Sequence, residues 1–354
     1  MSAPATWGLI GFGNIGREIV RQVGQPKVAD RLGLQPAPEF IAESKGIMKA
    51  DGRTPGGYQS LDDVPKLPDV VFVAIPSSDD GKAAYKYISH ILDKGKLVIT
   101  AEKGALANHY SALQAASDDF KRFGVTATVG GGTRLLQVAR EYCQDIENIT
   151  QIHLALNGTL AAIMDWVAPL QGAGLPLSEA AKRAIERGYA EPGSDSAAAI
   201  IRTEAEGDIP KKLAIFCNSV GLGGSLLDWN KLRFSLTDKQ IEKAVDPAVP
   251  RRFIVSLYPV SSAEGQAGPE DDIVGGFNVS HGSWRLAGGF RRIDANPLFG
   301  ALSALTGPGN GMVIGLGPET SDGVYAITGP GAGVSPTVNA MIDDYVRLKA
   351  RKES

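Results

Sequence analysis

Cysteine and histidine are scarce in this sequence, and their scarcity excludes several classes of protein. Cys143 and Cys217 are the two cysteines in 354 residues, too few for a disulfide framework or a cysteine-ligated zinc cluster. The four histidines are scattered along the chain without the spacing of metal ligands. We therefore expect neither a disulfide-stabilised fold nor a histidine- or cysteine-based metal centre.

Long apolar runs and basic blocks are also absent. No apolar run reaches the ~18 residues of a membrane span, and the N-terminus lacks the charged-then-apolar pattern of a secretory signal. The net charge is −3, and no long block of lysine and arginine occurs. These features predict a cytoplasmic protein without a nucleic-acid or membrane partner.

Glycine, by contrast, is abundant, with 43 residues in the chain. The usual share of glycine is ~7%, so the sequence predicts many tight turns and close backbone approaches to a ligand. Hydrophobic residues make up 43% and charged residues 21%, as in an ordinary globular protein. The length fits one large domain or two joined ones.

The first third of the chain alternates between predicted strands and helices. Residues 6–23 read as a short apolar strand, a glycine turn and a helix. Apolar runs at 39–44, 69–76 and 96–100 also have the pattern of strands, and a helix is expected over 81–94. A further helix is expected over 105–124, and a strand with a turn over 125–132. This alternation predicts a doubly wound parallel sheet.

The remainder of the chain predicts a second, mixed α/β domain. A strand is expected over 149–156, followed by helices, one of which spans 177–188 with Ser178 as N-cap and Gly188 as C-cap. Beyond residue 250 the sequence becomes rich in predicted strands, and a last helix covers 335–350. We expect a dinucleotide-binding domain over 1–148, a substrate and dimerisation domain over 149–328, and a segment over 329–354 that returns to the first domain.

A glycine-rich turn follows the first strand. Gly11, Gly13 and Gly16 have the GxGxxG spacing, and Asn14 and Ile15 lie at the start of the helix that follows. In this context the first glycine allows the tight turn, the second a close approach to a pyrophosphate, and the third close helix–strand packing. The pattern predicts a Rossmann-type domain that binds NAD or NADP at the helix N-terminus.

The end of the second strand gives conflicting signals on the choice of nucleotide. Glu43 is suited to the ribose hydroxyls of NAD, whereas Ser44 and Lys45 are suited to the 2′-phosphate of NADP. We favour NADP, with NAD accepted.

Two further segments carry charged residues in notable positions. In "LVITAEKGALAN", an apolar strand ends at Glu102 and Lys103, and in "GDIPKKL" Asp208 and Lys212 stand four residues apart on one helix face. Taken separately, Lys103 reads as a surface lysine, and Asp208 with Lys212 reads as a surface ion pair.

Taken in order, several motifs resemble those of the homoserine dehydrogenase family over nearly the whole chain. They are "VITAEKGALA", "ATVGGG", "LALNGTL", "LSEAAKRAIERGYAE", "GDIPKKLAI" and "TGPGAGVSPT". The resemblance implies that Lys103 and Lys212 take part in proton transfer during hydride transfer to the nucleotide. It further implies that Glu191 and Asp208 bind the amino and hydroxyl groups of the substrate.

The resemblance also implies the rest of the binding site. Thr159 and Tyr189 are expected to contact the substrate together with Glu191 and Asp208. The expected cofactor contacts are Gly11, Gly13, Asn14, Ile15, Gly16, Ser44, Lys45, Ser77, Lys103, Gly188 and Gly333.

The chain departs from the family pattern in four places. The segment 192–207 is longer than usual, Arg134 replaces a proline, and Ala161 and Ala162 replace an Asn-Tyr pair. Thr126 stands where a sodium-binding glutamate is expected, so no metal is predicted. These departures leave open a related dehydrogenase of another small hydroxy acid or aldehyde. A non-catalytic nucleotide-binding protein is a third alternative, disfavoured because both lysines and both acids are present. We expect a homodimer formed through the strand-rich part.

Overall fold

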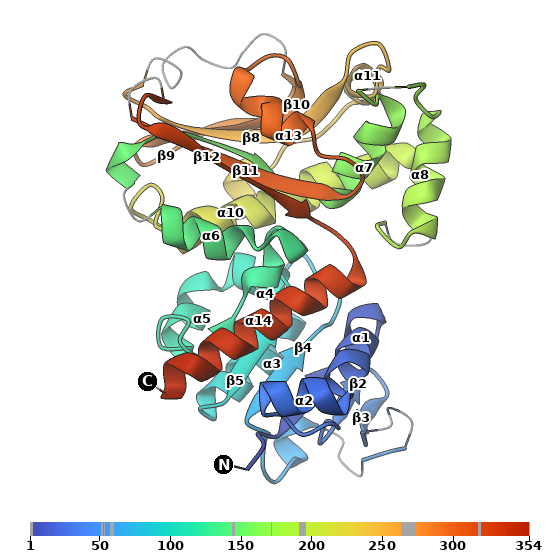
Figure 1. Cartoon of the computed structure of the whole chain (residues 1–354), viewed down its shortest axis with the longest axis vertical. Helices are drawn as coiled ribbons and strands as arrows, with labels where there is room; N and C mark the ends of the chain where they lie inside the picture. Colours follow the sequence, from blue (N-terminus) through green and yellow to red (C-terminus); the bar gives the residue numbers. More distant parts are fainter. Residues whose placement is uncertain are drawn as a thin grey trace. The chain divides into compact units, whose positions relative to one another are not determined.

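The computed structural model describes residues 3–50, 52, 54–56, 60–143, 146–170, 172–190, 196–262, 273–317 and 320–353. The chain divides into two compact units (Figure 1). The first comprises Met1–Thr128 together with Val334–Ser354, and the second comprises Val129–Gly333. The chain thus changes units after Thr128, 20 residues before the boundary expected at 148, because α6 and the strand β7 that follows belong to the second unit.

The first unit is built on a six-stranded sheet with the order β3-β2-β1-β4-β5-β6. All neighbouring strands pair in parallel except β2 and β3, which form a hairpin. The strands are β1 (Trp7–Ile10), β2 (Ile41–Glu43), β3 (Gly46–Met48), β4 (Val70–Val73), β5 (Leu97–Thr100) and β6 (Phe123–Gly124). The chain reverses its winding between β1 and β4, so ligands are expected beyond the carboxyl ends of these two strands.

Helices cover both faces of this sheet. They are α1 (Asn14–Val23), α2 (Pro26–Leu32), α3 (Lys82–Asp93), α4 (Gly104–Asn108), α5 (Tyr110–Ala116) and α14 (Val334–Glu353). The helix expected over 335–350 is confirmed, and Val338, Met341, Ile342 and Tyr345 form a buried apolar stripe on it. These side chains pack in one core with residues of α1, β1 and β4.

The helix expected over 105–124 is wrong in its extent. It is divided at His109, and α5 ends at Ala116, whose carbonyl accepts a hydrogen bond of 2.6 Å from the Arg122 guanidinium. Asp118, Asp119 and Phe120 then adopt positive φ angles, which no helix allows. Side-chain bonds local to this turn thus override the helical periodicity.

The strand expected over 125–132 is also wrong. Single 3₁₀ turns occupy Thr126–Thr128 and Gly131–Thr133, and pairing with β5 is limited to Phe123–Gly124. The Thr126 amide and hydroxyl both donate to the buried carboxylate of Asp344 on α14, at 2.7 and 2.6 Å. This anchor directs the backbone away from the sheet, and burial raises the pKa of Asp344.

The contact between α1 and the start of α14 predicts a pH dependence of stability. The Glu18 carboxylate accepts hydrogen bonds from Arg21 and Gln22 on its own helix and from Ser335 at 2.8 Å. The bond from Arg21 and the amide and hydroxyl donors lower the pKa of Glu18 from 4.5 to about 2. Because its pKa is lower in the folded chain than in the unfolded one, the ionised Glu18 carboxylate stabilises the fold above pH 4.5. This stabilisation is lost as the pH falls toward 2, where the carboxylate becomes protonated.

We therefore expect Glu18→Gln to have a lower melting temperature than the wild type at pH 7. The difference should shrink as the pH is lowered from 4.5 to 2, because the wild type loses the ionised carboxylate that the variant never had. Thermal unfolding followed by circular dichroism across this range measures it. A difference that is the same at every pH would contradict the assignment.

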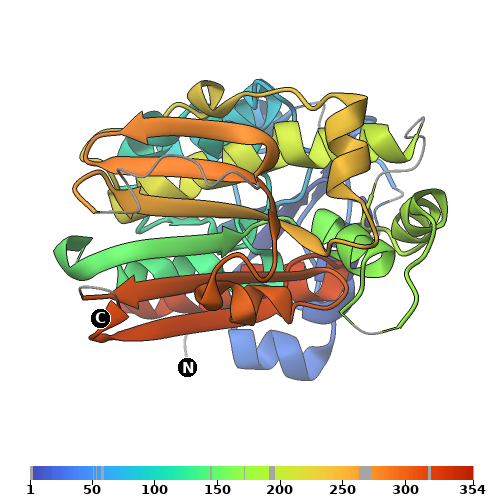
Figure 2. The same cartoon turned by 90° about the horizontal axis from the view of Figure 1, so that it is seen from above.

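The second unit contains a six-stranded sheet of order β12-β11-β7-β8-β10-β9, and all its neighbouring strands are antiparallel. The strands are β7 (Ile149–Ala155), β8 (Arg251–Pro259), β9 (Val274–His281), β10 (Trp284–Arg292), β11 (Gly309–Leu316) and β12 (Gly323–Pro330). Viewed from above, they form a single layer with β12 at its edge (Figure 2). The sequence correctly predicted a strand-rich segment after residue 250.

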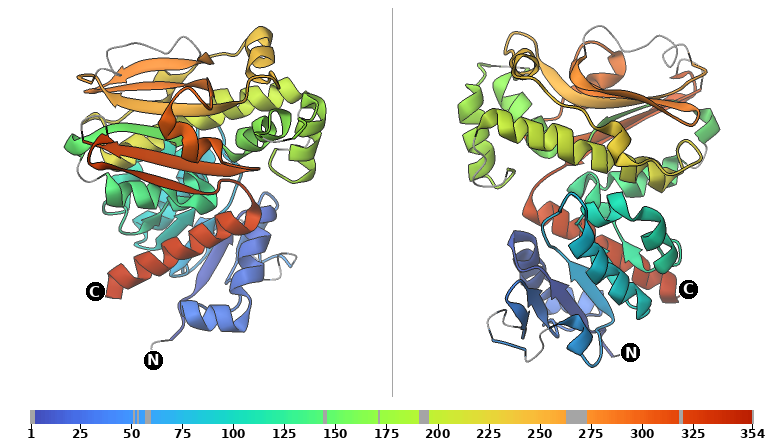
Figure 3. Two further views of the ribbon diagram at one scale, coloured as in Figure 1. Left: turned by 45° about the horizontal axis from the view of Figure 1, so that its top comes forward. Right: turned by 180° about the vertical axis from the view of Figure 1, so that it is seen from behind.

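The helices of this unit are α6 (Leu135–Tyr142), α7 (Gly158–Val167), α8 (Leu177–Glu186), α9 (Ala197–Arg202), α10 (Ile209–Val220), α11 (Asp238–Ala244) and α13 (Gly300–Ser303). Helices α6 and α10 lie on one face of the sheet and α13 on the other (Figure 1). A π-helical turn, Thr203–Asp208, connects α9 to α10, so the three run on without a loop (Figure 3). Helix α8 begins at Leu177 after Pro176, so Ser178 is not its N-cap, whereas Gly188 adopts the expected left-handed conformation beyond its end.

None of the helices in the described part of the chain has the length and apolar composition required to cross a bilayer.

Candidate active site

The fold requires two of the three glycines in the turn between β1 and α1. Gly11 has a φ of +96°, and a Cβ atom there would lie 2.4 Å from the Ala74 carbonyl oxygen. A Cβ on Gly16 would lie 2.0 Å from the Gly11 carbonyl oxygen. A Cβ on Gly13 would meet nothing within 4 Å. The fold itself thus requires Gly11 and Gly16, whereas Gly13 borders open space.

The start of α1 is suited to an anion. Gly13 is its N-cap, no side chain caps it, and its first turn carries no acidic residue. The first amide groups of a helix lack partners within the helix and point along the positive end of its dipole. Asn14 at this end is exposed. A pyrophosphate in front of Gly13 would satisfy these donors.

We predict that Gly13→Val weakens nucleotide binding without unfolding the chain. The new side chain would project into the open space that a pyrophosphate needs, and it would collide with no protein atom. The Kd for NAD and NADP should rise by about tenfold or more, since a phosphate contact to a helix N-terminus is lost. Fluorescence titration of the reduced nucleotides measures this effect, and an unchanged Kd with an unchanged melting temperature would show that the turn is only structural.

The three residues at the end of β2 differ in exposure. Glu43 is the last residue of the strand, half-buried, and it pairs with Gly46 across the hairpin. Ser44 and Lys45 form the exposed turn. The hairpin therefore presents one carboxylate, one hydroxyl and one ammonium group within three consecutive residues.

The end of β5 separates the roles of Glu102 and Lys103. The Glu102 carboxylate is 1% exposed and accepts hydrogen bonds from the amides of Gly104 and Ala105 at 2.6 and 2.8 Å, so it caps α4. Burial raises its pKa. The Lys103 amide donates to the Ser77 hydroxyl at 3.2 Å, which brings together two of the expected cofactor contacts. The glutamate is therefore structural, and the half-buried lysine lies at the carboxyl edge of the sheet.

In the second unit, Lys212 is held from two sides. Its ammonium group lies 2.7 Å from the Asp208 carboxylate, and the two side chains are 12% and 11% exposed. The same nitrogen donates to the Leu156 carbonyl oxygen at 3.0 Å. The Asn310 amide, fully buried, donates to that carbonyl as well, at 3.1 Å. The pair is therefore a largely buried ion pair and not the solvated surface pair of an isolated helix.

Two residues of this cluster were missed from the sequence. Asn157 donates to Glu204 at 2.5 Å and to Asp208 at 2.7 Å. Glu204, Asp208 and Lys212 stand at i, i+4 and i+8, which is a visible signal for Glu204. Asn157 precedes "GT" at the start of α7, where it reads only as an N-cap.

The Gly158–Thr159 segment is fixed against two others. A Cβ on Gly158 would lie 2.7 Å from the Pro308 carbonyl oxygen and 2.9 Å from the Ala332 nitrogen, so α7 begins directly beside the segment that ends at Gly333. The Thr159 hydroxyl donates to the Tyr189 carbonyl at 2.8 Å. The structure thus brings two of the expected substrate contacts, Thr159 and Tyr189, together.

The turn from Gly188 to Ala190 is further supported by Trp166. The Tyr189 ring stacks on the indole with 6.2 Å between ring centroids, and the guanidinium groups of Arg183 and Arg187 lie 5.0 and 5.5 Å from its centre. Glu191, predicted to bind the substrate, lies outside the described residues, as do residues 192–195 of the long segment 192–207. The remainder of that segment contains α9 and most of the π turn.

The positions that depart from the family pattern are mostly buried. Ala161 and Ala162 are 7% and 0% exposed on α7. Arg134 begins α6 with a φ of +59°. Thr126 is engaged by Asp344, as described above. Within the described residues, no group of three or more histidine, cysteine, aspartate or glutamate side chains is placed to hold a metal ion.

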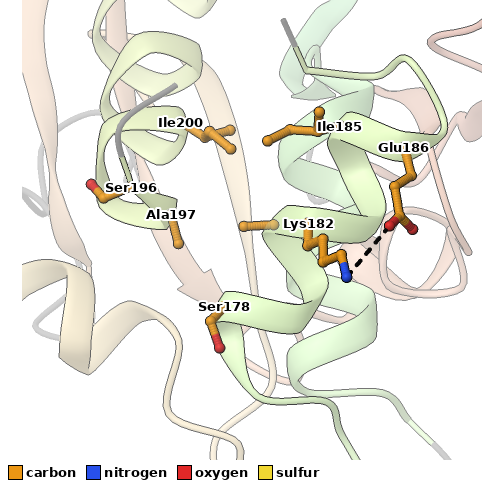
Figure 4. A pocket seen from close by; sticks show the side chains of 8 residues that line it. Ser178, Lys182, Ile185, Glu186, Ser196, Ala197 and Ile200 are labelled. Atoms are coloured by element: carbon orange, nitrogen blue, oxygen red, sulfur yellow. Dashed lines mark ion pairs between the residues drawn. The ribbon is translucent and has the colours of Figure 1, made fainter. Parts of the chain in front are cut away.

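Among the described residues that line a hollow between α8 and α9, none is a predicted site residue. It has a volume of about 580 Å³ and is lined mainly by apolar side chains such as Ala181, Ile185 and Ile200, with the pair Lys182–Glu186 at its rim, 3.7 Å apart (Figure 4). These exposed charges have no buried acid–base neighbour, so we do not assign chemistry to it.

Comparison with known proteins gives sequence and structural relatives. No family model matches the chain. The homoserine dehydrogenase of Emericella nidulans is 25% identical over 246 residues, which cover 63% of this chain and 64% of that protein. The NAD(+)-dependent homoserine dehydrogenase of Pseudomonas canavaninivorans is 31% identical over 143 residues, which cover 40% and 37%.

The chain is similar in sequence to these two homoserine dehydrogenases.

The matches span less than two thirds of both of these homoserine dehydrogenases. The fold is matched more completely. A hyperthermophilic archaeal homoserine dehydrogenase in complex with NADPH aligns with a TM-score of 0.65 and 19% identity, over 98% of each chain. The predicted site residues lie in both units of this chain. The first unit contains residues 11–16, 44, 45, 77 and 103. The second contains residues 159, 188, 189, 208, 212 and 333.

Proposed function

We propose that the chain is a homoserine dehydrogenase, an NAD(P)-dependent oxidoreductase that interconverts L-homoserine and L-aspartate 4-semialdehyde. The observation that carries this proposal is the buried Lys212–Asp208 pair beside Gly158 and Thr159, in a chain whose other unit has a phosphate-binding turn. The sequence similarity to two homoserine dehydrogenases supports it.

The reaction requires one hydride transfer and one proton transfer. As the hydride leaves the hydroxyl-bearing carbon for the nicotinamide ring, the hydroxyl proton must be taken up by a base. A lysine in its neutral form accepts that proton and becomes an ammonium group, which Asp208 then stabilises. We assign this role to Lys212, and we assign Lys103 to the nucleotide side of the same reaction.

The substrate contacts are proposed on the same grounds. The carboxylates of Asp208 and Glu191 are suited to the hydroxyl and ammonium groups of the substrate. Thr159 and Tyr189 border the same part of the second unit. Bound substrate would complete a set of charge-assisted hydrogen bonds, which are stronger than neutral ones.

NAD or NADP would be held by the glycine turn, by the end of β2, and by Ser77 and Lys103; Gly188 and Gly333 stay predicted contacts. The exposed Ser44 and Lys45 favour NADP through its 2′-phosphate, while Glu43 accommodates the ribose hydroxyls of NAD. When bound, the nucleotide supplies the hydride acceptor. An absorbance assay of NAD⁺ and NADP⁺ reduction with L-homoserine tests both the activity and the preference, and no reduction of either would contradict the proposal.

We also propose a homodimer formed through the second unit. The edge strand β12 is exposed along its length, with Val324 and Tyr325 each 44% exposed. Exposed apolar edge strands are prone to pair with another chain. The molar mass of the protein in solution tests this: twice the mass of one chain is expected. A cytoplasmic location stays a prediction.

A further inference from the structure

The side chain of Asn157 joins three segments of the second unit. It is 5% exposed, and its carbonyl oxygen accepts a hydrogen bond of 2.7 Å from the Leu160 amide, which caps α7. Its amide nitrogen donates to the carboxylates of Glu204 and Asp208. An asparagine amide has two N–H groups, so each carboxylate takes one of them.

Both carboxylates come from the π-helical turn Thr203–Asp208. A π turn contains one more residue than an α-helical turn, and such turns are frequent at functional sites. Here the turn places two acids against one nitrogen atom. Like charges at this separation repel each other, and the two N–H groups between them offset the repulsion.

We propose that Asn157 is a positioning residue for Lys212. Its amide holds the Glu204 and Asp208 carboxylates side by side, and Asp208 in turn holds the Lys212 ammonium group against the Leu156 carbonyl. Asn157 acts through Asp208 and needs no contact with substrate or nucleotide. The inference rests on the proposed dehydrogenase function, in which Lys212 exchanges the substrate proton.

Two single substitutions separate this role from helix capping. Asn157→Ser keeps an oxygen that caps α7 but removes both donors to the carboxylates. Asn157→Asp keeps the cap and the shape and adds a third carboxylate. Both variants should fold, and kcat for L-homoserine should fall by roughly tenfold in Asn157→Ser and more in Asn157→Asp, with a smaller change in the KM of the nucleotide.

A reciprocal exchange supplies the rescue. In the double variant Asn157→Asp, Glu204→Gln, the amide is moved to position 204, where it donates to the carboxylate at 157, and the number of carboxylates returns to two. The double variant should recover most of the kcat that Asn157→Asp loses. If Asn157 served only to cap α7, the amide at position 204 would repair nothing, and the double variant would be no more active than Asn157→Asp.

The experiment distinguishes failure of the positioning role of Asn157 from failure of the proposed dehydrogenase function. A wild type that oxidises L-homoserine, together with Asn157→Asp within about threefold of its kcat, or a double variant no more active than Asn157→Asp, would overturn the inference. A wild type inactive with both nucleotides would instead contradict the proposed function. The carboxylate clamp would then be judged from the melting temperatures of the same four proteins, where the exchange should restore what Asn157→Asp loses.

Discussion

Replacing Lys212 by alanine is expected to lower kcat for L-homoserine oxidation by roughly 10²–10⁴, the usual cost of losing one positioned acid–base group. The Kd of the nucleotide should change little, because the phosphate-binding turn belongs to the other unit of the chain. Stopped-flow measurement of reduced nucleotide formation, with fluorescence titration of binding, gives both quantities.

The geometry around Lys212 supplies the reason for this size of effect. Its side chain is 12% exposed, and its ammonium group is held by the Asp208 carboxylate and the Leu156 carbonyl. The same two contacts would hold the ammonium group that forms when the neutral amine takes up the substrate proton, so this step needs little reorganisation. Alanine removes the proton acceptor and leaves Asp208 without its ion-pair partner on α10.

A matched variant separates proton transfer from charge. Lys212→Arg keeps a cation beside Asp208, but a guanidinium group does not release its proton at neutral pH. Its kcat should therefore be close to that of Lys212→Ala, while its melting temperature should be closer to that of the wild type. A variant of either kind that retains more than about a tenth of wild-type kcat would remove Lys212 from the proton-transfer step.

The fold of the first unit was largely predictable because its signals are local. A strand, a glycine turn and a helix follow one another within residues 7–23, and Gly11 and Gly16 are constrained by atoms of the same unit. The predictions failed where distant contacts decide the structure. The strand expected over 125–132 is replaced by 3₁₀ turns because Thr126 is bonded to Asp344, 218 residues away.

In the candidate site, too, local patterns were predictable from the sequence and distant contacts were not. The Asp208–Lys212 pair follows from helical spacing, which the sequence displays directly. The contacts of Asn157 with Glu204 and Asp208 span 47 and 51 residues and depend on a π turn, which has no sequence signature of its own. The capping role of Glu102 was likewise not predicted, because a carboxylate beside a lysine at the end of a strand reads equally as a site residue.

The ammonium group of the substrate gives a test of substrate identity. The turn that precedes Glu191 is well supported: Gly188 has a φ of +69°, the Tyr189 carbonyl accepts the Thr159 hydroxyl, and the Tyr189 ring stacks on Trp166. If Glu191 binds a substrate ammonium group, the contact is a charge-assisted hydrogen bond. Such bonds contribute about 1.5–3 kcal/mol.

Glu191→Gln keeps the shape of the side chain and removes its charge, so kcat/KM for L-homoserine should fall by roughly 10- to 100-fold. The same change should cost little for 4-hydroxybutyrate, which has the hydroxyl and carboxylate groups but no amino group. Glu186→Gln is the matched control, because Glu186 lies five residues earlier and is engaged only in an exposed pair with Lys182 among the described residues; it should leave both substrates unaffected. Equal losses on the two substrates in Glu191→Gln, or a wild type that prefers 4-hydroxybutyrate, would favour a dehydrogenase of another small hydroxy acid. In that case the buried Ala161 and Ala162 and the arginine at position 134 are the first positions to examine for the altered specificity, since they differ from the family pattern.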